Sequence, residues 1–387
     1  FRDDAEVWTA CGWKKVAEVP VGETIATLNE DTLAIEFQPV SGKTDESYTG
    51  PMYQWKHRAL DLEVTAGHRM MYRTRQGVAR TRRADQLPRS DLHTLQGVTA
   101  SQASVGMAHA AFLGLYLSEG STRWDGKHYY TWIWQNNDDP WMRAWLLKTG
   151  YPWRYYRDKR GGRGWCVAGK ALHESLKVFG DSRTKYVPDE IKQATAEEIR
   201  VFLDAYTRGD GAKKTGVITT YSRRMADDLQ GLFSLVGITA RITPHREGWI
   251  VTPRTSGVTL SPRVLSVTEK TCRVVCVEVP NRTILVRFPG SIPVWVGNSP
   301  AVTWHQMWRC GSQGVHWVIL DELPGQDLES EALAQDVLDQ TKTQFPDHPT
   351  TLTVDCGDWA GAQVSEKGPG PIIRLGRPPS QRAISLR

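Results

Sequence analysis

The sequence contains few cysteines, and they follow no pattern that typically holds a metal. They form no CxxC pair and no Cys/His cluster, and they lie at Cys11, Cys166, Cys272, Cys276, Cys310 and Cys356. This usage argues against a structural zinc site and favours a reducing compartment.

Long apolar runs are also missing. None approaches the roughly 18–20 residues that a membrane-spanning helix needs, so we expect no membrane partner. The first residues, Phe1-Arg2-Asp3-Asp4, carry acid and lack both an initiator Met and a signal-peptide pattern, so we expect a fragment or a processed product. With 40% hydrophobic residues the chain can form folded cores, and 387 residues at about 150 per domain suggest two or three domains.

Charge is divided unevenly along the chain. The formal net charge is +5 overall, but it is +9 over residues 1–298 and −4 over residues 299–387. This division predicts two different roles, with the basic front the better partner for a polyanion.

Short strands and turns dominate residues 1–90. Two pairs of residues, one within this stretch and one near residue 298, have side chains suited to reactions at a peptide bond. Thr65 and His68 lie three apart at a strand end, a spacing that lets both face one peptide bond and activate it. Asn298-Ser299 follows a Gly/Pro-rich stretch. An Asn amide can attack its own carbonyl and cleave the backbone, and the following hydroxyl can accept an acyl group. The alternatives are that His68 is an ordinary histidine in a turn and that Asn298-Ser299 is an ordinary loop sequence.

Three segments, in order, resemble an intein splicing domain. They are Asp4-Ala5-Glu6-Val7-Trp8-Thr9 with Gly12–Val16, Glu63-Val64-Thr65-Ala66-Gly67-His68-Arg69-Met70, and Val277–Asn281 through Val296-Gly297-Asn298 followed by Ser299. The resemblance implies an all-β, horseshoe-like (Hint) fold and self-excision, with ligation of the flanking segments through Ser299. It makes His68 the helper at the N-terminal junction.

The sequence departs from the intein pattern at two places. The resemblance puts the first nucleophile, a Cys or Ser, just before Phe1. Many members also place a His before the terminal Asn, where this chain has Gly297. Glycine cannot transfer a proton, so either another group or water assists the cyclisation of Asn298, or this step is slow.

Two predicted helices end in the same unusual way. One runs through Ala108–Leu117 into Ser118-Glu119-Gly120, and the other from Ile199 into Gly209-Asp210-Gly211. An acid at a helix C-terminus opposes the helix dipole, and a glycine there permits a left-handed cap. If Gly114 and Ala205 let the helices pack closely, Glu119 and Asp210 meet, and Mg²⁺ between them suits oxygen ligands and a phosphate substrate. Two unrelated helix caps are the alternative.

These motifs resemble those of LAGLIDADG homing endonucleases. Phe112–Gly120 matches the first motif, Phe202–Gly211 the second, and Thr184–Ile191 the segment that carries the family's Lys, so the resemblance implies that Lys185 assists near the attacking water. A weak internal repeat supports two sheets that lie along the major groove of double-stranded DNA. The candidate DNA contacts are Arg123, Lys127, Arg154, Arg157, Lys213, Lys214 and Arg241.

Residues 299–387 predict a different fold. Ala301–Met307 and Gly314–Glu322 indicate a hairpin, Ser330–Phe345 a helix, and Thr351–Asp355 a strand that ends in an acid. This order resembles the RNase H-like nuclease domain of phage terminase large subunits, which makes Asp355 a metal ligand. An unrelated α/β host enzyme is the alternative.

The sequence therefore predicts a multidomain chain: an all-β splicing domain (1–101 and 251–298), an α+β LAGLIDADG endonuclease within it (102–250), and a partial α/β RNase H-like terminase segment (299–387). We expect Mg²⁺ as the cofactor and cytoplasmic activity in a phage-carrying bacterial host. The partners are double-stranded DNA, the chain itself in cis and, after splicing, the terminase packaging complex. Two alternatives stay open: an endonuclease decayed into a DNA-binding or structural insert, and a chain that acts chiefly as the terminase nuclease.

Overall fold

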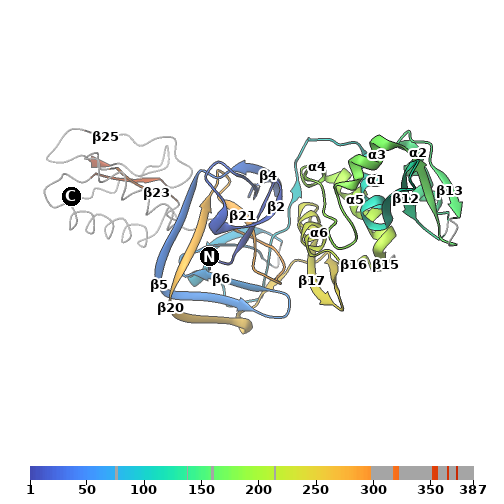
Figure 1. The fold of residues 1–387 in the computed structure, drawn as a ribbon. Helices are drawn as coiled ribbons and strands as arrows, with labels where there is room; N and C mark the ends of the chain where they lie inside the picture. Colours follow the sequence, from blue (N-terminus) through green and yellow to red (C-terminus); the bar gives the residue numbers. More distant parts are fainter. Residues whose placement is uncertain are drawn as a thin grey trace. The chain divides into compact units, whose positions relative to one another are not determined.

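The computed structural model describes residues 1–74, 77–136, 138–157, 161–212 and 215–297, together with the backbone of four short strands beyond them (Figure 1). Contacts divide the chain into two units. The first comprises Phe1–Ala66 and Met70–Gly297, and the second comprises Gly67–Arg69 and Asn298–Arg387. Within the described part of the chain, no helix is both long enough and apolar enough to cross a lipid bilayer.

An eleven-stranded sheet forms most of the strand-rich part of the first unit. Its main path runs β10-β4-β3-β1-β21-β22-β7-β9-β19, with β2 on β1 and β8 on β7. The strands are β1 (Glu6–Thr9), β2 (Gly12–Lys15), β3 (Thr24–Leu28), β4 (Ala34–Pro39), β7 (Arg69–Arg73), β8 (Ala79–Arg83), β9 (Leu92–His93), β10 (Val98–Thr99), β19 (Thr259–Leu260), β21 (Thr283–Arg287) and β22 (Val294–Gly297). Three short 3-10 turns connect strands: Val16–Glu18, Ala84–Gln86 and Pro262–Val264.

A long antiparallel ribbon makes the second sheet of this part. It joins β5 (Gly42–Lys56) to β20 (Leu265–Glu278), and β6 (Asp61–Thr65) pairs with the other edge of β5. The register runs from Gly42↔Glu278 to Trp55↔Leu265 without a break. The apolar end of β20 was predictable from its valines, whereas β5 is polar and is held as a strand by its two neighbours.

Strands from the two ends of the first unit alternate in space. Glu6 pairs with Arg287 and Val7 with Val286, although about 280 residues of chain separate them (Figure 1). Val286 and Val7 are fully buried, so this pairing is part of the core. The prediction of a sheet-rich chain with several parts is confirmed at this level, and the horseshoe-like detail stays a prediction.

The part between these strands contains the same succession of elements twice. The first half has α1 (Met107–Glu119), β11 (Gly120–Trp124), β12 (Tyr129–Trp134), α2 (Pro140–Lys148), β13 (Arg154–Arg157), β14 (Arg163–Ala168) and α3 (Lys170–Lys177). After α4 (Asp189–Lys192) the second half has α5 (Ala196–Asp210), β15 (Gly211–Ala212), β16 (Val217–Thr220), α6 (Arg223–Leu235), β17 (Thr239–His245) and β18 (Gly248–Arg254). The sheets follow the same order, β11-β12-β14-β13 and β15-β16-β18-β17, so the internal repeat is confirmed.

Helices α1 and α5 pack against each other at the centre of this repeat. Residues Ala110 to Leu117 of α1 are all buried, which explains its nearly continuous apolar sequence. A Cβ at Gly114 would lie 2.5 Å from the Phe202 carbonyl oxygen and 2.8 Å from the Ala205 Cβ. The predicted role of Gly114 and Ala205 in close helix packing is therefore confirmed.

The second unit is described through four short strands. β23 (Trp317–Asp321) pairs in parallel with β24 (Thr351–Asp355), and β25 (Val364–Ser365) pairs with β26 (Ile372–Ile373). The first strand of the expected hairpin and the expected helix, Ser330–Phe345, lie outside the described residues. The RNase H-like fold stays a prediction.

Candidate functional site

The ends of α1 and α5 bring two carboxylates together. Glu119 is the last residue of α1 and Asp210 is the last residue of α5. A Cβ at Gly209 would lie 2.2 Å from the Ser118 hydroxyl oxygen and 2.8 Å from the Glu119 Cγ, so the final turns nearly touch. Because the helices cross with their C-termini adjacent, the sequence-predicted pair forms a single site.

The glycines after these acids act differently from the expectation of a left-handed cap. Gly120 has φ −87° and ψ 151°, and Gly211 has φ −109° and ψ 157°, so both lead straight into strands. A Cβ on Gly120 would lie 2.3 Å from the Tyr116 carbonyl oxygen, and one on Gly211 would lie 2.4 Å from that of Thr207. The expectation of a left-handed cap was wrong: glycine is needed here because the chain doubles back closely on the helix.

Burial and mutual repulsion disfavour the charged forms of both acids. Burial raises the pKa of Asp210 to about 7, and the neighbouring charge of Glu119 adds to the effect. Burial also raises the pKa of Glu119, opposed by the positive charge of Lys185. Raised carboxyl pKa values in a shared site are the signature of an arrangement that a cation would stabilise.

Lys185 reaches the same helix end from the loop before α4. It is only 6% exposed, and its Nζ donates hydrogen bonds to the carbonyl oxygens of Tyr116 at 3.0 Å and Gly120 at 2.7 Å. Burial lowers its pKa to about 8, against the raising effect of Asp210 and Glu119. The side chain is therefore a buried cation that caps α1, not an exposed surface lysine.

The donor set fits a hard divalent cation. Glu119 and Asp210 offer carboxylate oxygens, and Mg²⁺ is commonly held by one or two carboxylates while it keeps several waters. No cluster of three or more His, Cys, Asp or Glu residues is found among the described residues, so the two carboxylates would hold such an ion with water or a phosphate.

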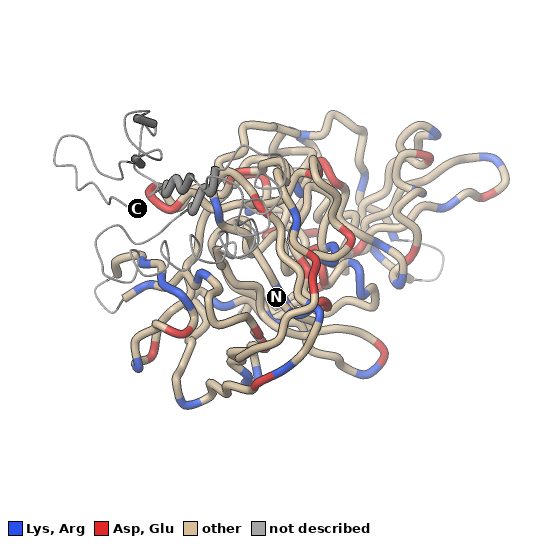
Figure 2. Tube along the Cα trace, turned by 90° about the vertical axis from the view of Figure 1, so that its left-hand side faces the viewer, with Lys and Arg blue, Asp and Glu red and all other residues tan. Residues whose placement is uncertain are grey.

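The described DNA-contact candidates occupy the two sheets. Arg123 lies on β11, Arg154 and Arg157 lie on β13, and Lys127 lies in the turn between β11 and β12; all four are exposed. Arg241 on β17 is half-buried, and burial together with the charges of Arg58 and Arg254 lowers its pKa. Lys213 and Lys214 lie outside the described residues. Figure 2 shows basic and acidic positions interleaved along the trace.

One face of the first sheet combines two arginines with aromatic rings. Arg123 pairs with Tyr130, and both Trp132 and Arg154 pair with Cys166, so these side chains share a face. Trp132 stacks on Trp134 with ring centroids 4.6 Å apart and planes 4° apart. Thr131 and Ile133 are fully buried on the opposite face of β12, which leaves Trp132 and Trp134 on the side of the arginines.

The start of the chain is held against β20. The Phe1 amino group donates to the Val275 carbonyl oxygen at 3.0 Å, and the Val275 amide donates back to Phe1 at 2.9 Å. Arg2 reaches Glu63 of β6 at 3.1 Å, and Thr65 ends that strand. The predicted N-terminal junction therefore lies on the same small sheet as Thr65.

His68 lies in the turn that connects β6 to β7, and its side chain is fully buried. Burial holds the pKa of this imidazole well below its ordinary value, so the ring is neutral near pH 7. A neutral imidazole can accept or donate a proton at a reacting group without first losing one to water.

The strand that leads to the predicted C-terminal junction lies beside the strand that follows His68. In β22, Val296 pairs with Met70 of β7, and Gly297 pairs with Thr283 of β21. Asn298 and Ser299 lie outside the described residues, and so does the side chain of Asp355, whose backbone belongs to β24. Strand pairing thus brings together two segments that the sequence had joined only by resemblance.

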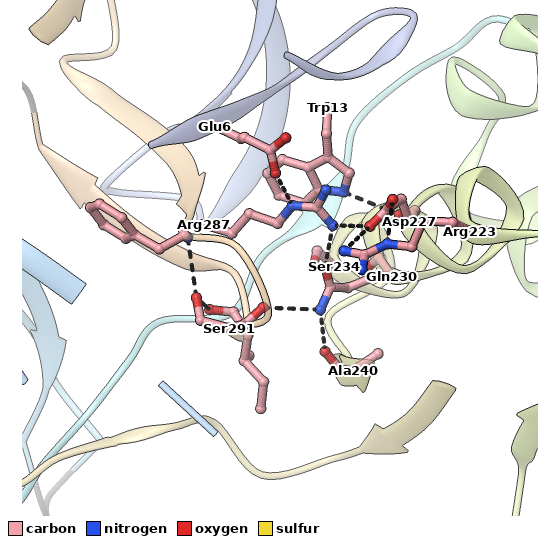
Figure 3. Close-up of polar contacts among 11 residues, drawn as sticks. Glu6, Trp13, Arg223, Asp227, Gln230, Ser234, Ala240, Arg287 and Ser291 are labelled. Atoms are coloured by element: carbon pink, nitrogen blue, oxygen red, sulfur yellow. Dashed lines mark hydrogen bonds and ion pairs between the residues drawn. The ribbon is translucent and has the colours of Figure 1, made fainter. Parts of the chain in front are cut away.

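Little in the sequence indicates a buried polar cluster around Arg287. This side chain is 4% exposed and donates to Glu6 at 2.7 Å and to both Asp227 and Gln230 at 2.7 Å (Figure 3). The one signal was the polar run within an otherwise amphipathic helix at residues 223–235. Burial lowers the pKa of the Phe1 amino group, against the raising effect of the nearby Cys276.

Comparisons with known proteins find distant similarity. No family model matches the chain. An ATP-dependent Clp protease proteolytic subunit from Chlamydomonas moewusii is 23% identical over 289 residues, which cover 62% of this chain but only 28% of that protein.

Similar solved structures include the homing endonuclease I-DmoI with its target DNA, at 14% identity and TM-score 0.31, over 38% of this chain and 89% of that one. They also include an AceL NrdHF class 3 split intein, at 8% identity and TM-score 0.30, over 77% and 97% of the two chains. The N-terminal LAGLIDADG domain of DUF199/WhiA has 12% identity and TM-score 0.25, over 38% and 74%.

Proposed function

We propose that residues 102–250 are a divalent-metal-dependent endonuclease that cleaves double-stranded DNA at a specific long site. The observation that carries this proposal is the meeting of Glu119, Asp210 and Lys185 at the ends of two packed helices. Two sheets with the same strand order flank these helices, and each half offers one carboxylate. Such a site suits a two-strand substrate, one strand for each half.

The residues divide the work of hydrolysis. Glu119 and Asp210 would hold the cation, which supplies Lewis-acid charge to a phosphate oxygen when bound. Asp210 must be ionised for this, so its raised pKa restricts metal binding at low pH. Lys185, with its pKa lowered to about 8, can place or share a proton near the attacking water. Arg123, Arg154 and the other basic sheet residues would contact the DNA backbone.

The experiment uses DNA that carries the uninterrupted host gene, incubated with Mg²⁺ and the protein. We expect a double-strand break at one site, and loss of cutting in the Glu119→Gln, Asp210→Asn double variant. Cutting that persists in this variant would overturn the assignment. Binding without cutting by the unaltered protein would favour the alternative of a decayed, DNA-binding insert.

We further propose that the strand-rich part carries out protein splicing. The pairing of Val296 with Met70 supports this second function, since it brings the chain before Asn298 beside the strand after His68. His68, neutral near pH 7, would assist an acyl shift at the N-terminal junction together with Thr65. The Ser299 hydroxyl would then take over the upstream segment as an ester. Cyclisation of Asn298 would break its peptide bond to Ser299 and release the intein, and the ester would shift to the freed Ser299 amine as a peptide bond.

Splicing is tested in a chain extended by a Cys and a flanking segment before Phe1. Mass spectrometry should detect the ligated flanks, and the Asn298→Ala variant should not form them. Ligation by that variant would contradict the assigned chemistry. Protein that consists of residues 1–387 alone should give no ligation and at most cleavage after Asn298.

The host of the splicing unit is proposed from sequence alone. Residues 299–387 would be part of a terminase nuclease with Asp355 as a metal ligand, and the mature host would join a DNA-packaging complex. If this is right, a recombinant protein with both flanks joined should bind Mn²⁺ or Mg²⁺, and Asp355→Asn should abolish that binding. Metal binding unchanged by Asp355→Asn would leave the unrelated host enzyme as the better explanation.

A further inference from the structure

Helix α6 lies against strands from both ends of the first unit. A Cβ at Gly231 would lie 2.1–2.5 Å from ring atoms of Trp8, so this indole of β1 rests directly on the helix backbone. The Trp13 indole of β2 donates to the Asp227 carbonyl oxygen at 3.1 Å. On the C-terminal side, the Gln230 amide donates to the Ser291 carbonyl oxygen at 3.2 Å. The helix thus contacts both sequence segments of the strand-rich part.

Arg287 joins these three elements at one point (Figure 3). It lies on β21, its guanidinium donates to Glu6 on β1, and it donates to Asp227 and Gln230 on α6, each at 2.7 Å. The guanidinium also lies 4.4 Å from the centre of the Trp13 ring. Only arginine offers a planar fork with enough donors for such a three-way contact.

The polarity of this interface is informative. Gln230 is 1% exposed and Arg287 is 4% exposed, so both were taken out of water on folding. Apolar side chains would pack at least as stably in such a place, whereas a buried charge with three hydrogen bonds favours one register over its alternatives. The register it marks is Glu6↔Arg287, the pairing of the first strand of the chain with the strand that precedes β22.

We propose that α6, although it belongs to the inserted part, is a structural component of the splicing fold, with Arg287 as its positioning residue. The Arg287 cluster holds β1 and β21 in register, and thereby the strand β22 that ends one residue before Asn298. This inference rests on the proposed splicing function. It implies that the endonuclease and the splicing centre share one helix.

The test compares two matched variants in the full chain extended by a Cys and a flanking segment before Phe1. Asp227 and Asp204 each form an ion pair with an arginine one helical turn away. The pairs are Arg223–Asp227 on α6 and Asp204–Arg208 on α5. Only Asp227 also receives Arg287. Asp227→Asn should slow formation of the ligated product at least tenfold, whereas Asp204→Asn should change it less than twofold.

A double-mutant cycle separates positioning from general loss of stability. Asp227→Asn and Arg287→Gln remove the same contact, so the double variant should be no slower than the worse single variant. Asp204→Asn combined with Arg287→Gln should instead be additive. Equal rates for Asp227→Asn and the unaltered chain, or additivity in the first cycle, would overturn the inference.

Hydrogen exchange keeps the inference testable apart from the splicing function. If the unaltered extended chain does not splice, the proposed function fails by itself. The amides of β21 and β22 should still exchange at least tenfold faster in Asp227→Asn than in Asp204→Asn if α6 holds these strands. Unchanged protection of β21 and β22 would overturn the structural role of the Arg287 cluster as well.

Discussion

At the scale of single residues, the acidic helix ends oppose local stability. Asp210 and Glu119 each stand at a helix C-terminus, where the dipole disfavours negative charge, and both are drawn out of water. Lys185 offsets part of this cost through the carbonyls of α1. The site therefore stores unfavourable charge that a divalent cation would relieve.

The first prediction concerns the pH dependence of stability without metal. The folded pKa of Asp210 is about 7, above its ordinary value of 3.8, so the folded state binds more protons between these values. Stability should therefore fall as pH rises from about 4 to 7. Asp210→Asn should stabilise the protein by about 2–4 kcal/mol at pH 8 and by little at pH 4, at roughly 1.4 kcal/mol per pKa unit.

Urea unfolding at pH 5 and pH 8, in chelator, measures this effect. The control is Asp204→Asn on the same helix, where the carboxylate is exposed and paired with Arg208. Adding Ca²⁺ should stabilise the unaltered protein at pH 8 and not Asp210→Asn. An Asp210→Asn protein that is less stable than the unaltered one at pH 8 would contradict the argument.

The second prediction concerns Lys185. Replacing it with Met removes the Nζ donor from the carbonyl oxygens of Tyr116 and Gly120, although the Gly120 amide still donates to that of Tyr116. It also leaves Glu119 and Asp210 without this buried cation. We expect a loss of about 1–3 kcal/mol in stability and DNA cleavage at least a hundredfold slower. Lys177→Met, at the exposed end of α3, is the control and should leave both unchanged. Thermal unfolding and a cleavage time course give the two readouts.

At the scale of elements, the crossing of α1 and α5 sets the distance between the carboxylates. Gly114 permits the backbones to approach, because any side chain there would meet the Phe202 carbonyl and Ala205. The capping box of Thr195 and Glu198 fixes where α5 begins, and so how far Asp210 lies from that start. Helix packing and helix length together place the site.

The third prediction is that Gly114→Ala separates these helices. Its Cβ would lie 2.5 Å from backbone oxygen, which cannot move aside cheaply. We expect a loss of about 1–3 kcal/mol, as for other overpacked cores, and Ca²⁺ stabilisation that is at least tenfold weaker in apparent affinity. Gly169→Ala, with open space around the added carbon, is the control. Calcium titration followed by thermal shift reports both, and an unchanged midpoint for Gly114→Ala would refute the prediction.

At the scale of the whole molecule, one buried cluster runs through both parts of the first unit. Trp8, Leu28 and Leu285 of the strand-rich part belong to the same cluster as Phe112 and Leu232 of the helical part. Shared apolar burial makes the separate opening of either part costly. The helical part is thus continuous in packing with the strand-rich part.

The fourth prediction follows from this continuity: the first unit should unfold as one. Tryptophan fluorescence and far-UV circular dichroism should give coincident denaturation curves for residues 1–297. Gly231→Leu, which would collide with the Trp8 ring, should instead split them into two transitions. Two transitions in the unaltered protein would show that the helical part folds independently.

Some elements are recognisable from local signals in the sequence, namely an alternating apolar pattern or a capping residue at the element's start. Strand β6 (Asp61–Thr65) and helix α2 (Pro140–Lys148) are two such elements. The alternating apolar residues of β6 and the Asp139 cap with Pro140 at the first turn need no distant partner. The two acidic helix ends could also be predicted from the sequence, because the same motif occurs twice.

Other features depended on residues far away in the sequence. The polar segment β5 is a strand because it pairs with β20 and β6, and its own sequence pattern does not predict a strand. Gly120 and Gly211 were expected as left-handed caps, but only the packed structure shows that close approach requires them. Lys185 is locally an ordinary lysine before a proline-started helix, and it becomes a buried cap only when α1 ends beside it.

The sequence by itself thus predicted which residues carry chemistry: Glu119, Asp210, Lys185, Thr65, His68 and the Asn298-Ser299 pair. The tertiary structure decided which of the described ones meet, since helix packing and strand pairing act between segments tens to hundreds of residues apart. It alone gave Arg287 its role, because a charged side chain is recognisable as buried only when its three partners are in place.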